Sequence, residues 1–270
     1  MWSGGGHVTP PVVLTVAGSD SGGGAGIQAD LKTFAAHRCY GASVITAVTA
    51  QNTRAVTGVH PVPPETVASQ LDAVLDDLPV AAVKTGMLGS PEIAEVVAER
   101  ARAGALPNLV VDPVLVASTG YALGVVAAIE RLLRYAVVIT PNLAEAAALT
   151  GRTVATPAEQ AEAAVSLAAR GPRHAVVTGG DGGDPEHAVD AISDGGPARF
   201  LRLPRVPTGN VHGSGCTFSA AFAAQLARGV PVPDAVAAAK SYVARALAGG
   251  AGWRLGGGIG PLDHFGWSQG

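Results

Sequence analysis

Short apolar runs alternate along this chain with segments in which apolar residues recur at helical spacing. The runs have the length and β-branched content of buried strands, and six occur before residue 180: 12–17, 44–49, 80–83, 109–111, 136–139 and 175–177. A weaker strand is expected at 56–59, and helices are expected in 27–35, in 64–75, after Ser90, in 125–133 and after Asn142. Strands that alternate with helices at this distance form βαβ units. The pattern therefore predicts an α/β fold with a mainly parallel sheet, whose ligands bind at the carboxyl ends of the strands.

Each predicted strand ends in a polar or glycine-bearing loop, as at 84–87 and 178–180. Between residues 181 and 207 the pattern changes to turns rich in glycine and aspartate, with short apolar segments at 188–192 and 200–203. This composition predicts a hairpin-like excursion from the sheet.

The last third of the chain is expected to close the fold with two helices. One follows Cys216, the other covers 233–248, and a glycine-rich terminal loop follows at 256–261. There is no internal repeat and no linker long enough to divide the chain, so we predict a single domain over 11–266. Tails are expected at 1–10 and 267–270.

Composition narrows the class of protein further. The 270 residues are 48% hydrophobic and 14% charged, which is typical of a compact domain. The net charge of −3 and the lack of a Lys/Arg run argue against a nucleic-acid-binding surface. The apolar runs are too short for a membrane span, and residues 1–10 contain no apolar signal segment. With only Cys39 and Cys216, outside any zinc or C-x-x-C spacing, a reducing cytoplasmic location is expected.

The stretch His212-Gly213-Ser214-Gly215-Cys216-Thr217 is the strongest candidate for chemistry. It is predicted to be a loop that turns into a helix, and a helix N-terminus offers free N–H groups and a positive dipole end to an anion such as phosphate. The same field favours a thiolate, so we expect Cys216 to be a base or a nucleophile. The alternative is a glycine-softened turn with a small residue packed under a helix.

Other strand ends carry weaker candidates. Asp30 is either a first-turn acid of the helix after Gly22–Gly26 or a ligand-facing acceptor, and Gln51 is suited to a ring nitrogen or an amino group. Asn142 and Glu145 fit a Mg²⁺ held mostly by water and phosphate oxygens, but they fit a helix N-cap with its first-turn acid as well. The standard phosphate and dinucleotide fingerprints are absent, as are zinc spacing and G-x-S-x-G.

The order of these candidates is more informative than any one of them. Five successive strand ends carry ligand-type residues, and the last ends in an anion-binding loop. Such an arrangement predicts an enzyme of phosphoryl transfer, in which the protein positions two substrates and neutralises charge.

The chain also resembles the hydroxymethylpyrimidine/phosphomethylpyrimidine kinases of thiamine biosynthesis, from about Val12 to Phe265. The motifs that carry the resemblance are AGSD (17–20), GAGIQADLKT (24–33), TAVTAQNT (46–53), KTGML (84–88), VDPV (111–114), TPNLAEA (140–146), HGSGCT (212–217) and GIGP (258–261). This family belongs to the ribokinase-like superfamily, so the resemblance implies a three-layer α/β/α sandwich, ATP and Mg²⁺ as cofactors, and a homodimer.

The resemblance also implies roles for single residues. The positions that match the pyrimidine site are Gly18, Asp30, Gln51, Met87 and Val114. Asn142 and Glu145 match the motif that organises Mg²⁺ and the triphosphate, and Asp112 lies with Glu145 at the metal. Further nucleotide contacts are implied for Thr178, Gly180, Thr208 and Lys240. The positions 213–215 match the anion hole, and Cys216 stands where most ribokinase-like enzymes have an aspartate base.

Two departures from the family affect the phosphate side. The family commonly has lysines where this chain has Ser118 and Thr178. Their loss is expected to lower the efficiency of the second phosphorylation, although Lys84 and Lys240 remain. A pyridoxal kinase of the same superfamily is the first alternative. A catalytically weak pyrimidine-binding protein is the second, and a Rossmann-type dehydrogenase is disfavoured because its fingerprint is missing.

Overall fold

The structure is a computed structural model that describes residues 9–115, 122–182 and 184–269. Its centre is one nine-stranded sheet in the order β3-β2-β1-β4-β5-β6-β7-β8-β9. The strands are β1 (Val12–Ser19), β2 (Tyr40–Gln51), β3 (Val56–Pro61), β4 (Val80–Thr85), β5 (Val110–Val111), β6 (Val138–Ile139), β7 (His174–Val177), β8 (His187–Ser193) and β9 (Arg199–Pro204). The pairs from β2 to β7 are parallel, whereas β3, β8 and β9 pair antiparallel. The mainly parallel sheet predicted from the sequence is confirmed.

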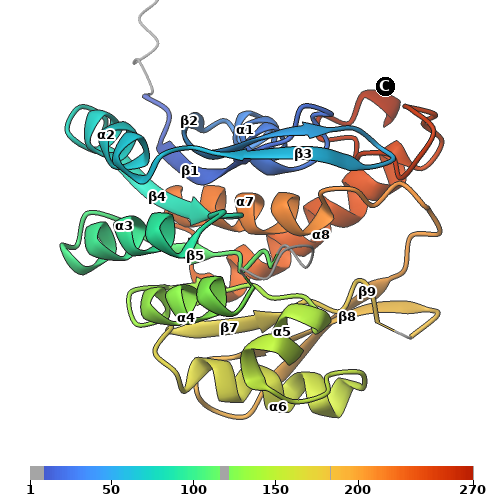
Figure 1. Cartoon of the computed structure of the whole chain (residues 1–270). Coiled ribbons are helices and arrows are strands. Elements are labelled where there is room, and N and C mark those ends of the chain that lie inside the picture. The colour runs from blue at the N-terminus through green and yellow to red at the C-terminus, as the bar shows by residue number, and fades with distance from the viewer. Residues whose placement is uncertain (1–8, 116–121, 183, 270) are drawn as a thin grey trace, which may run out of the picture.

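Helices cover both faces of the sheet (Figure 1). They are α1 (Gly26–Ala36), α2 (Pro64–Leu75), α3 (Pro91–Arg102), α4 (Ala122–Leu133), α5 (Leu143–Thr150), α6 (Pro157–Ala168), α7 (Ser214–Ala227) and α8 (Val232–Gly250). Residues of α2 to α6 share one buried apolar cluster, and residues of α1, α7 and α8 share the other. The result is the expected three-layer α/β/α sandwich.

Alternation along the central strands explains why both faces are covered. In β1, Leu14 and Val16 pack into the cluster with α2 to α6, and Val13 packs into the cluster with α1, α7 and α8. In β6, Ile139 and Val138 divide between the two clusters in the same way. A strand that is apolar on both faces needs a helical layer on each side.

Helix α6 has no counterpart among the predicted helices. The Thr156 hydroxyl accepts from the Glu159 N–H at 3.3 Å, and the Glu159 carboxylate accepts from the Thr156 N–H at 2.9 Å. Together with Pro157 at the first position, this is the capping-box start signal that the sequence carries. The signal was sufficient to predict the helix.

Two further expectations need correction. Lys84 is a residue of β4 and not of the following loop, since it pairs with Val110 in the parallel ladder. The predicted hairpin of 188–192 and 200–203 exists as β8 and β9, but β8 pairs with β7, so the hairpin extends the sheet instead of leaving it. The segment Trp267–Gln269 forms a short 3₁₀ helix near the end of the chain. Within the described residues, no helix is both long and apolar enough to cross a membrane.

The strand order places a crevice beside β1. The chain moves from β1 to β2 on one side and from β4 to β5 on the other, so the direction of winding reverses between β1 and β4. In open α/β sheets, ligands bind outside the carboxyl ends of the strands at such a reversal. Gly18 and Gly86 mark these ends.

Candidate functional site

The loop after β1 is closed around Asp20. One oxygen of this buried carboxylate accepts from the Gly22 N–H at 2.8 Å, and the other accepts from Gly24 and Ala25 at 3.1 and 2.9 Å. The latter oxygen lies 2.9 Å from Nε2 of His212. Burial alone would raise the pKa of Asp20, but the hydrogen bonds from His212 and from the backbone lower it below its usual range. Asp20 was not among the predicted site residues.

This loop packs directly against the start of α7. Gly213 has φ +84°, and a Cβ there would lie 1.9 Å from the Gly24 carbonyl oxygen. Only glycine combines this backbone conformation with so close an approach. Ser214, Gly215 and Cys216 form the first turn of α7, where N–H groups have no partner within the helix. The structure thus brings the predicted anion-binding loop to the end of β1.

Cys216 does not have the low pKa expected from the helix N-terminus. Burial raises the pKa of its thiol to about 12. Lys84 and the Gly26 N–H lower the pKa, while the charges of Asp112 and Asp30 raise it. Burial is the largest cause of this shift, and neither the burial nor the nearby carboxylates can be read from the sequence, so the role of Cys216 as a base stays a prediction.

Lys84 lies at the centre of a buried charge cluster. Its Nζ is 3.0 Å from both carboxylate oxygens of Asp30 and 3.6 Å from Asp112 Oδ2. The Thr15 hydroxyl donates to Asp30 at 2.6 Å, and the Ser219 hydroxyl donates to Asp112 at 2.9 Å. Burial alone would lower the pKa of Lys84, but the surrounding negative charges outweigh it, so the pKa is raised. Lys84 is thus bound to two carboxylates inside the protein, so a contact of Lys84 with phosphate stays a prediction.

Of the five positions predicted for the pyrimidine, four lie at or just after the carboxyl ends of neighbouring strands, and the fifth, Asp30, is fully buried. Gly18 ends β1 against Met87, since a Cβ at residue 18 would lie 2.3 Å from the Met87 Cε. Gln51 ends β2, where its Nε2 lies 3.4 Å from His212 Nε2. Asp30 projects from α1 into the buried cluster. Val114 follows β5, where its N–H donates to the Asp112 carbonyl at 2.9 Å.

Asn142 and Glu145 form the N-terminal capping box of α5. The Asn142 side chain accepts from the Glu145 N–H at 2.8 Å, and Glu145 Oε2 accepts from the Asn142 N–H at 2.9 Å. Burial, followed by the charge of Asp112, raises the pKa of Glu145 to about 8. The interpretation of these residues as a helix N-cap with its first-turn acid is therefore confirmed. The capping box does not use Oε1 of Glu145.

The donor set near Glu145 fits a hard cation. Asp112 and Glu145 repel each other electrostatically, which a cation between them would relieve. Oxygen ligands are those that Mg²⁺ prefers, and Mg²⁺ usually takes only one or two carboxylates beside water and phosphate. Across the described residues, no three His, Cys, Asp or Glu side chains converge as a metal cage. The site therefore fits a metal held mainly by substrate and water.

The expected nucleotide residues divide into two groups. Thr178 follows β7, and its N–H donates to the Pro141 carbonyl at 2.8 Å, beside the capping box; Gly180 is exposed two residues later. Thr208 lies in the loop before α7, where its hydroxyl accepts from the Asn210 N–H at 3.0 Å. Lys240 lies elsewhere, in a buried ion pair with Asp190. Ser118 lies outside the described residues.

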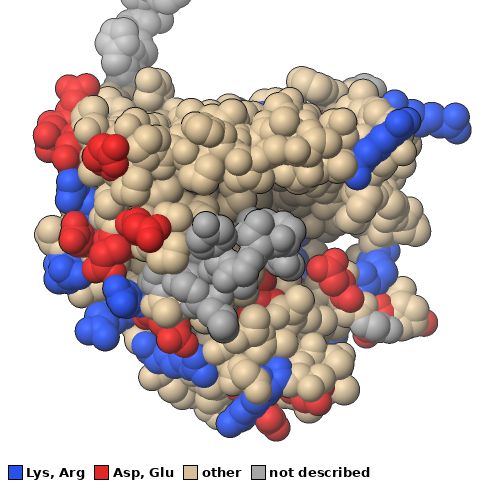
Figure 2. Space-filling view, in the orientation of Figure 1, with Lys and Arg blue, Asp and Glu red and all other residues tan. Residues whose placement is uncertain are grey.

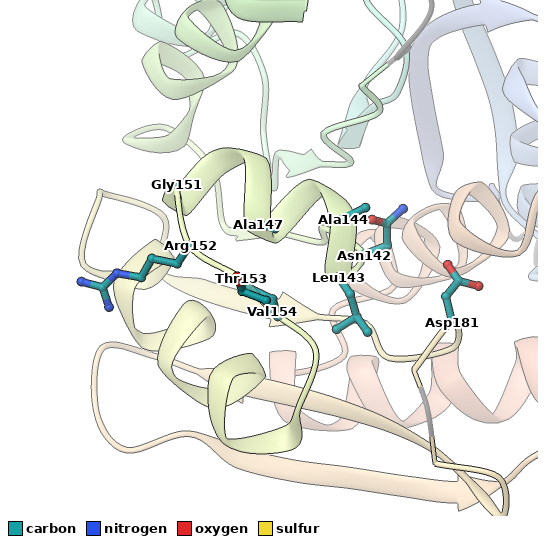
Figure 3. A pocket seen from close by; sticks show the side chains of 9 residues that line it. All are labelled: Asn142, Leu143, Ala144, Ala147, Gly151, Arg152, Thr153, Val154 and Asp181. Carbon is teal, nitrogen blue, oxygen red and sulfur yellow. The ribbon is translucent and has the colours of Figure 1, made fainter.

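An open groove of about 650 Å³ runs along α5 (Figure 3). Asn142 and Asp181 form one end of it, and Arg152 lies toward the other end. The apolar side chains of Leu143 and Val154 line its length. The groove therefore ends at Asn142, the N-cap of the helix whose first turn carries Glu145.

Sequence reasoning missed the residues that hold the site together. Asp20 had a signal, because an aspartate that opens a glycine run forms turns through its side chain. Ser219 and Thr15 had none, since their hydroxyls reach Asp112 and Asp30 only in the folded chain. The strand ends thus carry a hydrogen-bonding side chain at Gln51, a helix N-terminus at Ser214 and carboxylates at Asp112 and Glu145. Such groups suit a small polar ring beside a phosphoryl donor.

Comparison with known proteins agrees with this geometry. The family model for phosphomethylpyrimidine kinase matches residues 20–263. The hydroxymethylpyrimidine/phosphomethylpyrimidine kinase of Streptomyces coelicolor is 53% identical over 268 residues, covering 97% of each chain. A Bacillus subtilis pyridoxal kinase solved with ADP matches with a TM-score of 0.89 and 38% identity, over 95% of this chain and 98% of that one. A phosphomethylpyrimidine kinase from Clostridium difficile matches with a TM-score of 0.75 and 37% identity, over 87% and 99%.

Proposed function

The chain belongs to the phosphomethylpyrimidine kinase family, and we propose that it phosphorylates 4-amino-5-hydroxymethyl-2-methylpyrimidine twice for thiamine biosynthesis. It is an ATP-dependent kinase. The first phosphoryl group goes to the hydroxymethyl oxygen and the second to the phosphate thus formed. The observation that carries the proposal is the contact of the Gly213 turn with the Gly24 loop, which sets an anion-binding helix end beside the crevice at β1.

The pyrimidine is assigned to the crevice between β1 and β4. Gln51 supplies both an acceptor and a donor for the amino-pyrimidine edge, whereas Asp30 is fully buried, bound by Lys84 and Thr15, and supports the site from behind. Gly18 leaves room beside Met87, where any larger side chain would collide with the Met87 methyl group. Val114 adds apolar contact from the end of β5. These assignments place the hydroxymethyl group toward Cys216.

The triphosphate is assigned to the strand ends on the other side of Cys216. Asn142 and Glu145, with Asp112, would hold Mg²⁺, which when bound would offset the negative charge of the phosphates. Thr178, Gly180 and Thr208 line the nucleotide side. This division places donor and acceptor on opposite sides of the α7 N-terminus, so transfer occurs across it.

The anion hole and Cys216 are assigned to the transfer itself. The turn at residues 213–215 stabilises the charge of the transferred phosphoryl group, with the Ser214 N–H itself held by the Val211 carbonyl at 3.1 Å. Cys216 accepts the hydroxymethyl proton in the first step, for which it must be a thiolate. Burial, followed by the charges of Asp112 and Asp30, raises its pKa, so ligands that neutralise these carboxylates favour the thiolate. In the second step the acceptor is already a phosphate, so charge neutralisation matters more than base catalysis.

The test is ³¹P NMR of the purified protein with Mg·ATP and the hydroxymethylpyrimidine. Sequential appearance of the monophosphate and the diphosphate is the expected result. It would also establish that Ser118 and Thr178 are tolerated in place of lysine. A reaction that stops at the monophosphate would contradict the second phosphorylation. Absence of pyrimidine-dependent ATP consumption would leave a pyrimidine-binding protein.

A pyridoxal kinase is the second candidate. The observation in its favour is the TM-score of 0.89 to a pyridoxal kinase, against 0.75 to the phosphomethylpyrimidine kinase from Clostridium difficile. Pyridoxal as a parallel substrate in the same NMR experiment separates the two, since turnover of pyridoxal alone would establish this alternative. The dehydrogenase alternative does not fit the family.

We also propose a homodimer in the cytoplasm. The family resemblance supports the dimer, and the exposed edge strand β3 offers a surface for a second copy. The free thiols of Cys39 and Cys216 are consistent with a reducing compartment.

A further inference from the structure

Lys240 and Asp190 form a buried ion pair between α8 and β8. The Lys240 Nζ lies 2.7 Å from Asp190 Oδ2, and the two side chains are 7% and 4% exposed. A lysine that served the phosphates of ATP would be expected to end in an open site. Here the ammonium group instead ends on a carboxylate inside the protein.

The second oxygen of Asp190 reaches the loop after β7. Asp190 Oδ1 accepts from the Gly179 N–H at 3.0 Å, in a buried position. Gly179 itself is pressed against β8, since a Cβ there would lie 2.0 Å from the Val189 carbonyl oxygen. Gln160 supports the same place, because its Nε2 donates to the Val177 and Val189 carbonyls at 2.8 Å each. The peptide at Gly179 is therefore fixed by the hairpin of β8 and β9.

The next residue is held by the same hairpin. Arg205, directly after β9, donates to the Gly180 carbonyl at 2.5 Å, to Asp184 at 2.9 Å and to Gly182 at 3.0 Å. The loop Thr178–Gly180 thus has its N–H at Gly179 bound by one charged residue and its carbonyl at Gly180 bound by another. Both contacts orient backbone that the proposed function places against the nucleotide.

We propose that Lys240 acts on ATP indirectly, as a positioning residue that neutralises Asp190 and so lets Asp190 hold the Gly179 N–H. The inference rests on the proposed nucleotide site at Thr178 and Gly180. Removal of one member of a buried ion pair leaves an uncompensated charge, whereas replacement of both members is often tolerated. An amide at position 190 still accepts from Gly179, so the pair can be exchanged for uncharged residues without loss of that bond.

A double-mutant cycle tests this role with Lys240→Gln, Asp190→Asn and the two combined. We would measure ADP affinity by titration calorimetry, the KM for ATP, the KM for the pyrimidine, kcat and the melting temperature. Each single variant should weaken ADP binding and raise the KM for ATP by about tenfold, with the KM for the pyrimidine within about twofold of wild type. The double variant should return within about threefold of wild-type ADP affinity.

The opposite outcome is equally clear. If Lys240 binds phosphate directly, the double variant binds ADP as weakly as Lys240→Gln even where its melting temperature is restored. That result would overturn the inference and leave the proposed function intact. If a single variant does not fold, comparison of the double variant with wild type decides alone, because wild-type-like ADP affinity without the lysine supports the positioning role and its loss overturns it.

A surface pair provides the matched control. Arg100→Gln with Asp72→Asn removes the same two charges from the exposed pair between α3 and α2 and should leave ADP affinity and both KM values unchanged. Wild-type protein that binds no ADP would overturn the proposed function, and this inference with it.

Discussion

At the scale of single residues, opposing charges decide the chemistry of Cys216. The helix N-terminus and Lys84 favour a thiolate, while burial, Asp112 and Asp30 favour the neutral thiol and prevail. The side chain therefore needs the bound state to become a base.

Replacement of Cys216 by alanine should slow the first phosphorylation much more than the second. We expect the first rate constant to fall about 10²-fold, the typical contribution of a positioned base, with pyrimidine affinity changed less than about threefold. Measurement of the monophosphate and diphosphate by ³¹P NMR separates the two steps. Unchanged turnover of the hydroxymethyl substrate would remove the base assignment.

Replacement of Glu145 by glutamine should change how stability depends on pH. The folded chain raises the Glu145 pKa to about 8 from an ordinary value of 4.5. Between these values the folded state binds more protons than the unfolded state, so this group lowers stability as pH rises. In the presence of EDTA, the variant should match wild type at pH 4.5 and exceed its free energy of unfolding by up to about 5 kcal/mol at pH 8.5, since each pKa unit between 4.5 and 8 is worth about 1.4 kcal/mol.

Glutamine keeps the acceptor for the Asn142 N–H, so the capping box should survive this substitution. Added Mg²⁺ should stabilise wild type more than the variant above pH 8, where the carboxylate is ionised. Urea unfolding at several pH values, with and without Mg²⁺, provides the measurement. Parallel pH profiles for the two proteins would contradict the raised pKa.

At the scale of elements, the site depends on how closely α7 approaches the loop after β1. Two glycines allow this approach. Gly213, directly before the helix, has φ +84°, and Gly24 has no side chain that would collide with the start of the helix. A Cβ at Gly24 would lie 2.4 Å from the His212 ring. The start of α7 and the loop after β1 therefore fit each other closely, although they lie nearly 190 residues apart along the chain.

Gly213→Ala should therefore damage the site beyond its cost in stability. Left-handed backbone costs a non-glycine residue about 1 kcal/mol. The Cβ of alanine at 213 would also lie 1.9 Å from the Gly24 carbonyl oxygen, so one of the two must move. We expect a fall in kcat of at least about tenfold from the misplaced anion hole. Steady-state kinetics and thermal unfolding give the two readouts.

Gly229→Ala is the matched control. Gly229 has φ +78°, and a Cβ there meets nothing within 4 Å. This variant should show the same loss of about 1 kcal/mol with kcat intact. Equal kcat values for the two variants would show that the approach of Gly213 to Gly24 is not needed for transfer.

At the scale of the whole molecule, the edge of the sheet at β3 is the surface most suited to another chain. Every residue of β3 is exposed, and Val48, Val56 and Val59 of this hairpin are 49%, 53% and 49% exposed. Figure 2 shows an uncharged surface where Figure 1 places β3. An uncovered apolar edge strand invites pairing with another chain.

Val56→Lys combined with Val59→Lys should convert the proposed homodimer to a monomer. Two lysines at an edge oppose strand pairing and cannot be buried in an apolar contact. Size-exclusion chromatography with light scattering gives the mass, and the melting temperature should show an intact monomer fold. A wild-type monomer, or a double variant that stays dimeric, would contradict an interface at β3.

The sequence by itself determined the order of strands and helices, because apolar periodicity and capping signals are local. The runs at 12–17 and 44–49 became β1 and β2, and Pro64 begins α2. The capping box of helix α6, Thr156 with Glu159, is a local sequence signal as well. The motifs at strand ends also determined the family, since each lies on a turn whose residue types are set by the backbone there.

Only the tertiary structure decided which charges meet. Lys84 was expected in a loop near phosphate, and Lys240 at the nucleotide, but the fold buries each against carboxylates from distant segments. The same is true of the Cys216 pKa, which depends on Asp30 and Asp112. The local sequence pattern predicts periodicity and turns. Electrostatic interactions depend on distances between atoms that are far apart in the chain, and only the packing of the folded sheet sets those distances.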